Sequence, residues 1–243
     1  MAKLTGNIAG IGKIPELKRR ILFTLFFLAV YRLGVHVPVP GVNLAAFGSW
    51  LDQGQETILG LVNMFSGGAL RQMSVFALGI MPYISASIIL QLLTVVVPTL
   101  ERLQKEGERG RRKIVQYTRY GTVLLSVIQG YGMAMMMEGI EASTGSVVAN
   151  PGFGFRMMTV ISLTAGTAFI MWLGEQITER GIGNGMSLII YAGIVVNFPH
   201  AVLLTIEQMR LGQLGLIQVL ILLVLMVLVV GAIIFVERGH RRV

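Results

Sequence analysis

The chain has 243 residues, of which 54% are hydrophobic and 13% charged, and its mean hydropathy is +0.73. A soluble domain carries about 25% charged residues, so the composition excludes an ordinary soluble protein and predicts an all-α, polytopic transmembrane helix bundle. The absence of cysteine excludes disulfides and thiolate metal sites.

Six charge-poor apolar runs predict the membrane spans, because a hydrocarbon core of about 30 Å requires about 20 helical residues. An even number of spans places both termini on the same side of the membrane. The expected spans are 21–37, a span within 72–100 with its apolar body at 75–97, then 120–137, 157–174, a span within 181–206 and a span within 211–236.

Lysine and arginine are concentrated on one side of this topology. The N-terminal tail, the loop at 101–119, the turn after the fourth span and the C-terminus hold 16 of the 20 basic residues. The positive-inside rule makes that side cytoplasmic. Topology thus explains most of the net charge of +8 and disfavours nucleic-acid binding as the main role. The basic loop could still contact the phosphates of ribosomal RNA.

Arg32 lies about two-thirds along the first span and has two interpretations. Its long side chain can extend to the outer membrane interface, which is the interpretation that we favour. The alternative is a polar partner inside the bundle.

The external segment at 38–73 contains a turn at PVPG, a polar stretch and then the nine-residue apolar piece TILGLVNMF, which is too short to cross a bilayer. Ser66-Gly67-Gly68 interrupts it before the second span. Broken segments at membrane depth occur only where they are buried in protein or line a water-filled cavity. The pattern therefore predicts a re-entrant element, with an amphipathic interfacial helix as an equal alternative.

The sequence offers little catalytic chemistry. His36, His200 and His240 fall in three separate regions, and no HExxH, nucleophile elbow or P-loop is present. The glycine-rich run at 181–185 lacks the preceding strand and the Lys-Ser/Thr ending of a phosphate loop, so we interpret it as a tight cytoplasmic turn. No enzyme activity, metal or cofactor is expected.

Ion-coupled transport is also disfavoured, because such proteins carry ionisable residues within the membrane. The second to sixth predicted spans contain no Asp, Glu, Lys or Arg. Their Ser, Thr, Gln and Asn side chains are more often interhelical contacts than ligand sites. A cavity lined by neutral side chains suits a passive conduit whose substrate is driven by another machine.

Several long motifs resemble the SecY family, the channel subunits of the bacterial Sec protein-translocation complex. They are PVPGVN, FSGGALRQMSVFALGIMPYISASIILQLL, KEGERGRRKIVQYTRYG, WLGEQITERGIGNGMSLIIYAGIV and FVERGHRRV, and the resemblance covers 14–243. The family has ten transmembrane helices in two inverted five-helix halves, whereas this chain ends just after the sixth expected span. We therefore expect a fragment that forms no sealed channel by itself.

The resemblance implies three parts. Residues 1–20 form a cytoplasmic amino-terminal tail, 21–206 form the first five-helix half with a re-entrant plug at about 57–68, and 207–243 form the sixth helix and the start of a cytoplasmic loop. The fold class is thus a SecY-type transmembrane helix bundle.

The resemblance also implies an hourglass pore whose waist is a ring of apolar side chains. Ile80 and Ile84 would contribute from the second span, and Met186 and Ile190 from the fifth. Each pair is spaced by four residues and shares a helix face. Met186 replaces the isoleucine usual in the family, which keeps the ring apolar but makes it softer. Without the motif match, ordinary helix packing would be the better interpretation of all four.

The resemblance also implies plug, lateral-gate and docking roles for short stretches of this sequence. Polar residues of the second span could face the lateral gate or bond neighbouring helices, and basic residues on the cytoplasmic side could dock partners or only set the orientation. The expected plug residues are Asn63, Met64, Phe65, Ser66, Gly67 and Gly68; the gate residues are Ser85, Ser87 and Gln91; and the docking residues are Lys105, Arg109, Arg111, Arg112, Lys113, Arg180, Arg238, Arg241 and Arg242.

The resemblance implies a protein-conducting channel subunit in the bacterial inner (plasma) membrane, with both termini of this chain cytoplasmic. It would pass unfolded secretory polypeptides across the membrane and release hydrophobic segments into the lipid. The expected partners are SecE, SecG, the ATPase SecA, the ribosome and nascent polypeptides that bear signal sequences. The alternatives are a six-helix solute transporter and a structural fragment that is inactive alone.

Overall fold

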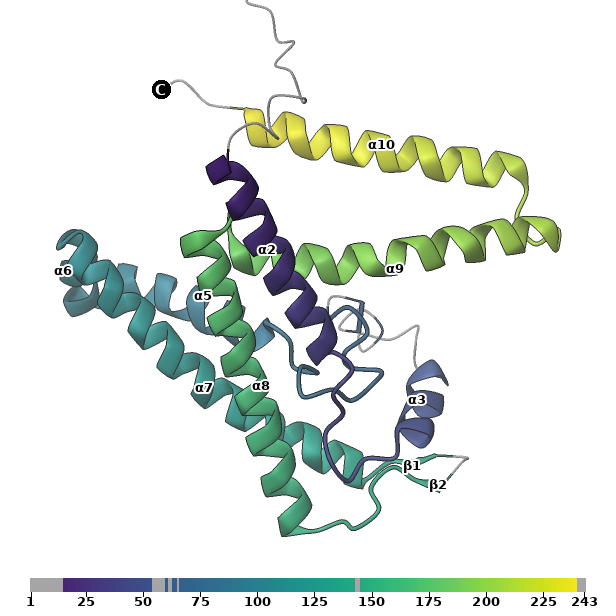
Figure 1. The fold of residues 1–243 in the computed structure, drawn as a ribbon, viewed down its shortest axis with the longest axis horizontal. Coiled ribbons are helices and arrows are strands. Elements are labelled where there is room, and N and C mark those ends of the chain that lie inside the picture. The colour runs from purple at the N-terminus through teal and green to yellow at the C-terminus, as the bar shows by residue number, and fades with distance from the viewer. Residues whose placement is uncertain (1–14, 54–59, 61–62, 65, 143–144, 240–243) are drawn as a thin grey trace, which may run out of the picture. The chain divides into compact units, whose positions relative to one another are not determined.

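The computed structural model describes residues 15–53, 60, 63–64, 66–142 and 145–239 (Figure 1). The chain divides into two compact units, 1–195 and 196–243. In the described part, one two-stranded hairpin accompanies the helices, which confirms the all-α prediction. The helices are α2 Pro15–Gly34, α3 Leu44–Gln53, α5 Met81–Val96, α6 Pro98–Lys105, α7 Glu108–Glu138, α8 Phe153–Arg180, α9 Gly185–Arg210 and α10 Leu216–Arg238.

Three helices in the described part, α8, α9 and α10, are long and apolar enough to span a membrane. A fourth span results if α5 and α6 are counted together, although the two helices are bent by 99° at the break between them. Helices α2 and α7 cover the first and third predicted spans without meeting the same length and composition criteria. Each of the six predicted spans thus contains a helix, and three or four of them qualify as spans by these criteria.

The predicted second span is wrong at its start, because residues 66–80 form a series of turns and the helix begins only at Met81. Three glycines in this stretch have positive φ angles, as does Met73 at 39°. These left-handed conformations are incompatible with a continuous right-handed helix. A mostly apolar sequence, with Arg71 as its one charged residue, thus forms an irregular backbone here in place of the predicted helix.

The turn segment 66–80 is held by its neighbours on several sides. Val75 donates its amide to the carbonyl of Val37, and Val39 donates to Met73, so the chain that leaves α2 pairs with the segment. On α8, a Cβ at Gly166 would lie 1.9 Å from the carbonyl oxygen of Val75. The absence of a side chain at Gly166 thus allows α8 to contact the segment backbone.

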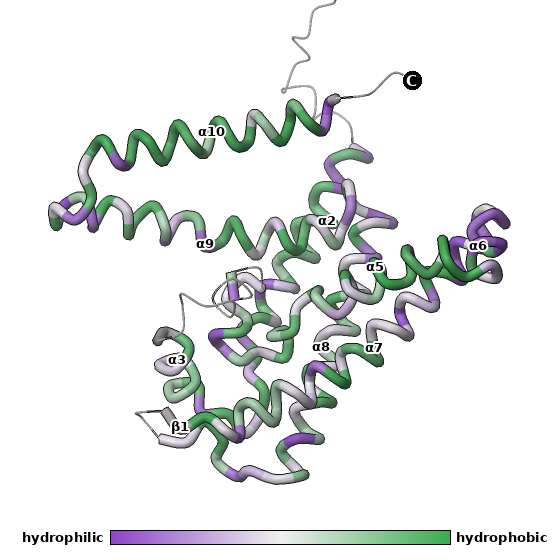
Figure 2. Tube along the Cα trace, turned by 180° about the vertical axis from the view of Figure 1, so that it is seen from behind, coloured by the Kyte–Doolittle hydropathy of each residue, from purple (hydrophilic) through white to green (hydrophobic). Residues whose placement is uncertain are grey.

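Helices α7 and α8 pack closely, as the two views of the ribbon show (Figures 1 and 2). The buried face of α7 carries small residues four apart, namely Thr118, Thr122, Ser126, Gly130 and Ala134. Such small residues let helix backbones approach in a membrane, where apolar surface alone gives no drive to associate. A Cβ at Gly130 would lie 3.5 Å from the Cα of Val160 on α8.

A small cap of irregular structure closes one end of the α7–α8 pair. Strands β1 (Glu141–Ala142) and β2 (Gly145–Ser146) form an antiparallel hairpin, and Val42 pairs with Val148 beyond it. The side chain of Asn43 accepts hydrogen bonds from the amides of Ala45 and Ala46 and so caps α3. Phe47 of α3 is fully buried in the apolar core beneath this cap.

The unit 196–243 contains the end of α9, with Pro199 inside the helix, and α10. Figure 2 shows α10 hydrophobic along most of its length, and none of its residues is buried. A helix that is apolar on all faces is typical of a membrane span.

Candidate functional site

An apolar cavity of about 190 Å³ lies within the first unit, beside the turn segment 66–80. It lies where α2, the segment, α5 and the start of α9 meet. None of its lining side chains carries a charge, and most are aliphatic. The lining residues are Tyr31, Ser66, Leu78, Gly79, Ile80, Met81, Ile84, Ile189 and Ile190.

Three of the four expected ring residues line this cavity, namely Ile80, Ile84 and Ile190. Ile80 is the residue before the first turn of α5, and its carbonyl accepts the amide hydrogen bond of Ile84, so the two share one helix face as their spacing predicts. The structure thus brings together residues that are more than 100 positions apart in the sequence.

Met186 lies outside the cavity lining. Its side chain is only 9% exposed and packs over Gly174 of α8, where an added Cβ would lie 2.4 Å from the Met186 sulfur. Met186 therefore joins α9 to α8 in this conformation. Ile189, three residues further along α9, lines the cavity instead.

Sequence reasoning missed Tyr31, Leu78, Gly79, Met81 and Ile189 as cavity residues. Leu78, Gly79 and Met81 lie within two residues of Ile80, and Ile189 is adjacent to Ile190. The spacing of four residues that relates the ring residues does not include them. Tyr31 gave no signal in the sequence, because it reaches the cavity only through the approach of α2 to Ser66.

The expected plug is described only in part. Phe65 and residues 57–59 and 61–62 lie outside the described residues. Ser66 lines the cavity and Gly67 is buried beside it, whereas Met64 is 40% exposed. The Asn63 carbonyl accepts hydrogen bonds from the Ser66 hydroxyl and the Gly68 amide. These bonds hold Asn63 close to Ser66 and Gly68 at the edge of the cavity.

Arg32 has a partner inside the bundle, so our preference for an interfacial side chain was wrong. Its Nη1 atom donates a hydrogen bond of 2.6 Å to the carbonyl oxygen of Gly67. The adjacent Tyr31 donates its hydroxyl to the carbonyl of Ser66 at 3.2 Å. Tyr31 also stacks on Phe76, with the ring centroids 5.9 Å apart.

The expected gate residues lie on α5. Ser85 and Ser87 are half-buried and Gln91 is exposed. Gln91 donates its side-chain amide to the Ser87 hydroxyl at 3.3 Å, which is a bond within the helix. This pair therefore does not bond α5 to a neighbouring helix.

The expected docking residues on α6 and α7 are exposed. Lys105 and Arg112 form ion pairs with Glu101 and Glu108 along their own helices, which contribute little to stability at the surface. Arg111 and Arg112 also line a polar pocket of about 570 Å³ with Arg119 and Glu179. Arg109 and Lys113 lie in the first turns of α7, Arg180 ends α8, Arg238 ends α10, and Arg241 and Arg242 lie outside the described residues.

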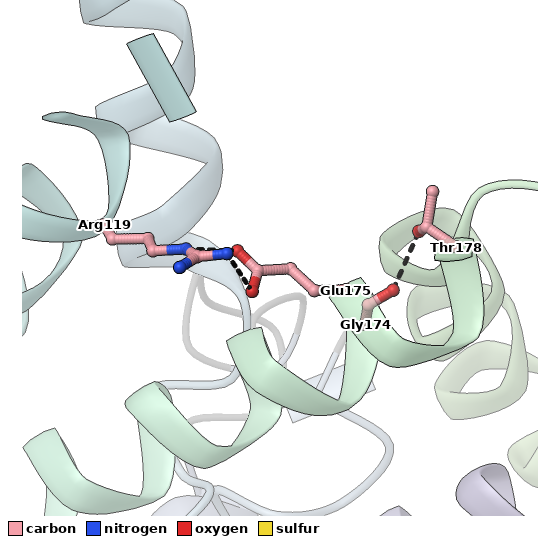
Figure 3. A network of polar contacts seen from close by, with 4 residues as sticks. All are labelled: Arg119, Gly174, Glu175 and Thr178. Atoms are coloured by element: carbon pink, nitrogen blue, oxygen red, sulfur yellow. Dashed lines mark hydrogen bonds and ion pairs between the residues drawn. The ribbon is translucent and has the colours of Figure 1, made fainter. Parts of the chain in front are cut away.

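A polar contact joins α7 to α8 near these charges. Figure 3 shows Arg119 of α7 making a two-pronged ion pair with Glu175 of α8, with both N–O distances at 2.8 Å. One turn further along, Thr178 donates its hydroxyl to the carbonyl of Gly174 at 2.8 Å (Figure 3). The same hydroxyl accepts the amide of Gly185 at 2.8 Å. These bonds fix the start of α9, which carries Ile189 and Ile190.

A second ion pair joins α7 to α8 at the cap. Arg156 binds the Glu138 carboxylate at 2.7 Å, and the amide of Gly152 donates to the same group at 2.8 Å. Glu138 lies just beyond the predicted third span. The hydrogen bonds from Arg156 and Gly152 hold the pKa of the Glu138 carboxyl below its ordinary value.

The described residues include no cluster of three or more His, Asp or Glu side chains able to hold a metal ion. The site is therefore defined by an apolar cavity, a backbone turn and the charged side chains that hold the turn and the helices. This geometry suits a cavity that the turn can occlude and that opens when the turn is displaced.

Several known proteins are similar to this chain in sequence. The family model described as SecY matches residues 74–243. The chain is 55% identical over 232 residues to the protein translocase subunit SecY of Escherichia coli K12, which covers 96% of this chain and 52% of that protein. It is 50% identical to the Pseudomonas aeruginosa subunit, over 96% of this chain and 51% of that protein. The chain thus spans about half the length of these relatives.

Two solved structures share the fold of this chain. One is described as the structure of a protein conducting channel, and the other as Sec61 in a canine ribosome-channel complex from the endoplasmic reticulum. Each has a TM-score of 0.53 and 17% sequence identity, and covers 79% of this chain and 41% of the other chain. Fold and sequence agree, and the chain belongs to the SecY family of multi-pass membrane proteins.

Proposed function

We propose that this chain forms one wall of a protein-conducting channel that passes unfolded polypeptides across a membrane. The observation that carries the proposal is the uncharged cavity lined by Ile80, Ile84 and Ile190 next to the Ser66–Gly67 turn. The names of the relatives support the same role.

An apolar constriction suits a substrate of any sequence. It excludes ions by dewetting, without a fixed charge that would select among them. Its dispersion contacts are individually small and non-specific, so it can close around an extended chain whatever the side chains. The sealing side chains would come from this chain and from the part of the channel that completes the ring.

Sideways release of hydrophobic segments is part of the proposal. Helix α5 carries the cavity residue Ile84 on one face and exposed apolar residues such as Leu92 and Val95 further along. A hydrophobic segment that left the cavity along α5 would pass Ser85, Ser87 and Gln91 on its way to lipid.

The proposed partners contact the basic cytoplasmic side. We assign Lys105, Arg109, Arg111, Arg112, Lys113, Arg180, Arg238, Arg241 and Arg242 to docking of the ribosome or of SecA, with ribosomal RNA phosphates as one possible contact. SecE and SecG would complete the complex in the bacterial inner membrane, and both termini of this chain would be cytoplasmic. The chain itself would perform no covalent chemistry, because SecA or elongation supplies the energy.

A site-specific photocrosslinker at Ile84 tests the assignment in membranes that contain the assembled complex. We expect an adduct with a stalled secretory nascent chain that depends on its signal sequence. The same crosslinker at Ile161 of α8, which is 62% exposed and does not line the cavity, is the control. Equal adducts at both positions, or none at Ile84, would contradict the pore assignment.

A second measurement separates the proposal from solute transport. Vesicles that contain the complex should show no saturable uptake of small solutes under conditions in which the Ile84 adduct forms. Saturable uptake without an adduct would favour the transporter, and the absence of both would favour a purely structural chain.

A further inference from the structure

Two consecutive residues of α2 bind two consecutive carbonyls of the turn beside the cavity. Tyr31 binds the Ser66 carbonyl and Arg32 the Gly67 carbonyl, at 3.2 and 2.6 Å. The sequence separation is 35 residues for both bonds. The turn is thus attached to α2 through its backbone, so that its own side chains play no part in these bonds.

Helix α9 confines the turn on another side. A Cβ added at Gly67 would lie 2.8 Å from the Cα of Gly193 and 3.3 Å from its carbonyl oxygen. The same Cβ would lie 3.3 Å from Nη1 of Arg32. Gly67 also has a φ angle of +64°, which other residues rarely adopt. The turn therefore fits between Arg32 and α9 only with a glycine at this position.

The Arg32 bond is of the strong kind. A charged donor to a neutral acceptor makes a shorter and stronger hydrogen bond than two neutral groups, and an arginine side chain does not lose its proton in proteins. An arginine within a membrane span is costly unless it has a partner. If the turn moves away, Arg32 therefore loses the carbonyl that solvates its charge.

We propose that Arg32 is a positioning residue that holds the Ser66–Gly67 turn against α9 and so keeps the cavity closed in the resting channel. Tyr31 assists as a second, neutral donor and also lines the cavity. An entering polypeptide opens the channel by displacing the turn, and Arg32 loses its carbonyl partner in that step. The inference rests on the proposed function for what enters, but the attachment itself is independent of the substrate.

The first experiment measures the attachment without any transport. These 243 residues contain no cysteine, so Ala69→Cys, at a fully buried position in the same segment, provides their one thiol, and labelling is counted against the complex without Ala69→Cys. The reaction rate of a water-soluble maleimide is measured in the assembled complex without substrate. We expect Arg32→Gln to raise the rate about tenfold, the change produced by loss of one such bond.

Two further variants serve as controls. Arg32→Lys keeps the charge and a donor, so it should retain most of the protection. Arg210→Gln removes an exposed arginine at the end of α9 and should leave the rate unchanged. Equal rates for Arg32→Gln and the unaltered chain, or equally fast labelling in Arg32→Lys and Arg32→Gln, would overturn the proposal.

The second experiment measures closure in the reconstituted channel. We expect Arg32→Gln to raise the substrate-free ion leak several-fold and to relax the requirement for a signal sequence, while secretory proteins with intact signals are still translocated. Preserved translocation shows that the variant folds. Unchanged leak and signal dependence in a variant with faster labelling would contradict the role in closure.

The two proposals can fail separately. Unaltered labelling of Ala69→Cys in Arg32→Gln, together with a signal-dependent Ile84 adduct, would remove the Arg32 proposal and leave the conduit standing. Faster labelling without any Ile84 adduct in the unaltered chain would confirm the attachment and remove the conduit.

Discussion

Gly185 at the start of α9 and Gly174 of α8 face each other, but they differ in what surrounds them. A Cβ at Gly185 would lie 2.0 Å from the backbone carbonyl oxygen of Gly174, whereas a Cβ at Gly174 would meet the flexible end of the Met186 side chain at 2.4 Å. A backbone atom held within a helix cannot move away alone, but a methionine side chain can change its rotamer. The two positions therefore tolerate a methyl group to different degrees.

We predict that Gly185→Ala destabilises the protein by about 1–3 kcal/mol, as overpacking of a close contact does. Gly174→Ala should change stability by less than about 1 kcal/mol, because a helical alanine gains roughly what the displaced Met186 loses. The measurement is the thermal unfolding midpoint of the two variants in the same detergent. Equal midpoints would show that the approach of α9 to α8 is loose.

The Glu138–Arg156 pair gives the cap a dependence on pH. Hydrogen bonds from Arg156 and from the Gly152 amide lower the pKa of Glu138 in the folded state below its ordinary value of 4.5. A depressed carboxyl pKa adds stability above the unfolded value, and this stability is lost as the pH falls through the folded value. We therefore predict that acidification below about pH 4.5 lowers the unfolding midpoint of the unaltered protein.

Glu138→Gln supplies the comparison. A glutamine cannot titrate, so the difference between the two midpoints should shrink as the pH falls from 7 towards 3. Parallel curves over this range would mean that Glu138 titrates alike in the folded and unfolded chains. Arg156→Gln should resemble Glu138→Gln near neutral pH, because either change removes the ion pair.

The ring residues were predicted from the family resemblance, because helical spacing alone favoured ordinary packing for all four. The spacing of four residues explains why Ile80, just before α5, and Ile84 on α5 line the same cavity. Tyr31 and the partner of Arg32 were not predictable, since both depend on a contact over 35 residues that no local pattern encodes. Met186 follows the same spacing from Ile190 but packs on Gly174, which a sequence pattern cannot distinguish from lining a cavity.

At the scale of elements, the sequence predicted where helices lie better than where they begin. The apolar stretch at 75–97 suggested one continuous span, yet α5 starts at Met81. Positive φ angles at Gly67, Gly68 and Gly79 determine the irregular segment, and glycine in an apolar run is equally compatible with a membrane helix. The break after α5 was readable in principle, because Pro98 forces Val97 into an extended conformation.

The hairpin of α6 and α7 carries the basic side chains at 101–119. Its two helices approach each other closely at Gly110. A Cβ at Gly110 would lie 1.6 Å from the carbonyl oxygen of Leu103. We predict that Gly110→Ala opens the hairpin and separates nitroxide labels at Gln104 and Gln116 by several ångströms, without altering any charge. Binding of the motor or ribosome should weaken with it, if the hairpin presents the docking residues as proposed.

Gly132→Ala is the matched control for the hairpin. Gly132 lies on the same helix α7, and a Cβ there meets nothing within 4 Å. The change should leave the label distance unchanged and stabilise the helix slightly, by about 0.5–1 kcal/mol. If both glycine variants gave the same label distance, the contact with Leu103 would not set the hairpin geometry.

At the scale of the whole molecule, the positions of charged and exposed apolar side chains are those expected of a membrane protein. The two charged ends of the α7–α8 pair lie on either side of small, uncharged packing residues: Arg119 with Glu175 at one end, Glu138 with Arg156 at the other. Helix α10 exposes every described face, as expected of a helix in lipid or against further protein. By the positive-inside rule, the distribution of basic residues predicts the direction of insertion.

Cysteine labelling from one side of the membrane tests that direction, and an introduced cysteine is the only one within these 243 residues. Gln104→Cys reports the α6–α7 hairpin and Ser146→Cys the cap; both positions are exposed. We predict that a membrane-impermeant maleimide added to intact cells labels Ser146→Cys and spares Gln104→Cys, and that inverted vesicles reverse the result. The expected contrast is at least tenfold, because seven basic residues at 101–119 favour retention in the cytoplasm by the positive-inside rule. The opposite pattern would place the proposed docking residues outside the cell and exclude a cytoplasmic motor or ribosome as their partner, whatever the cavity conducts.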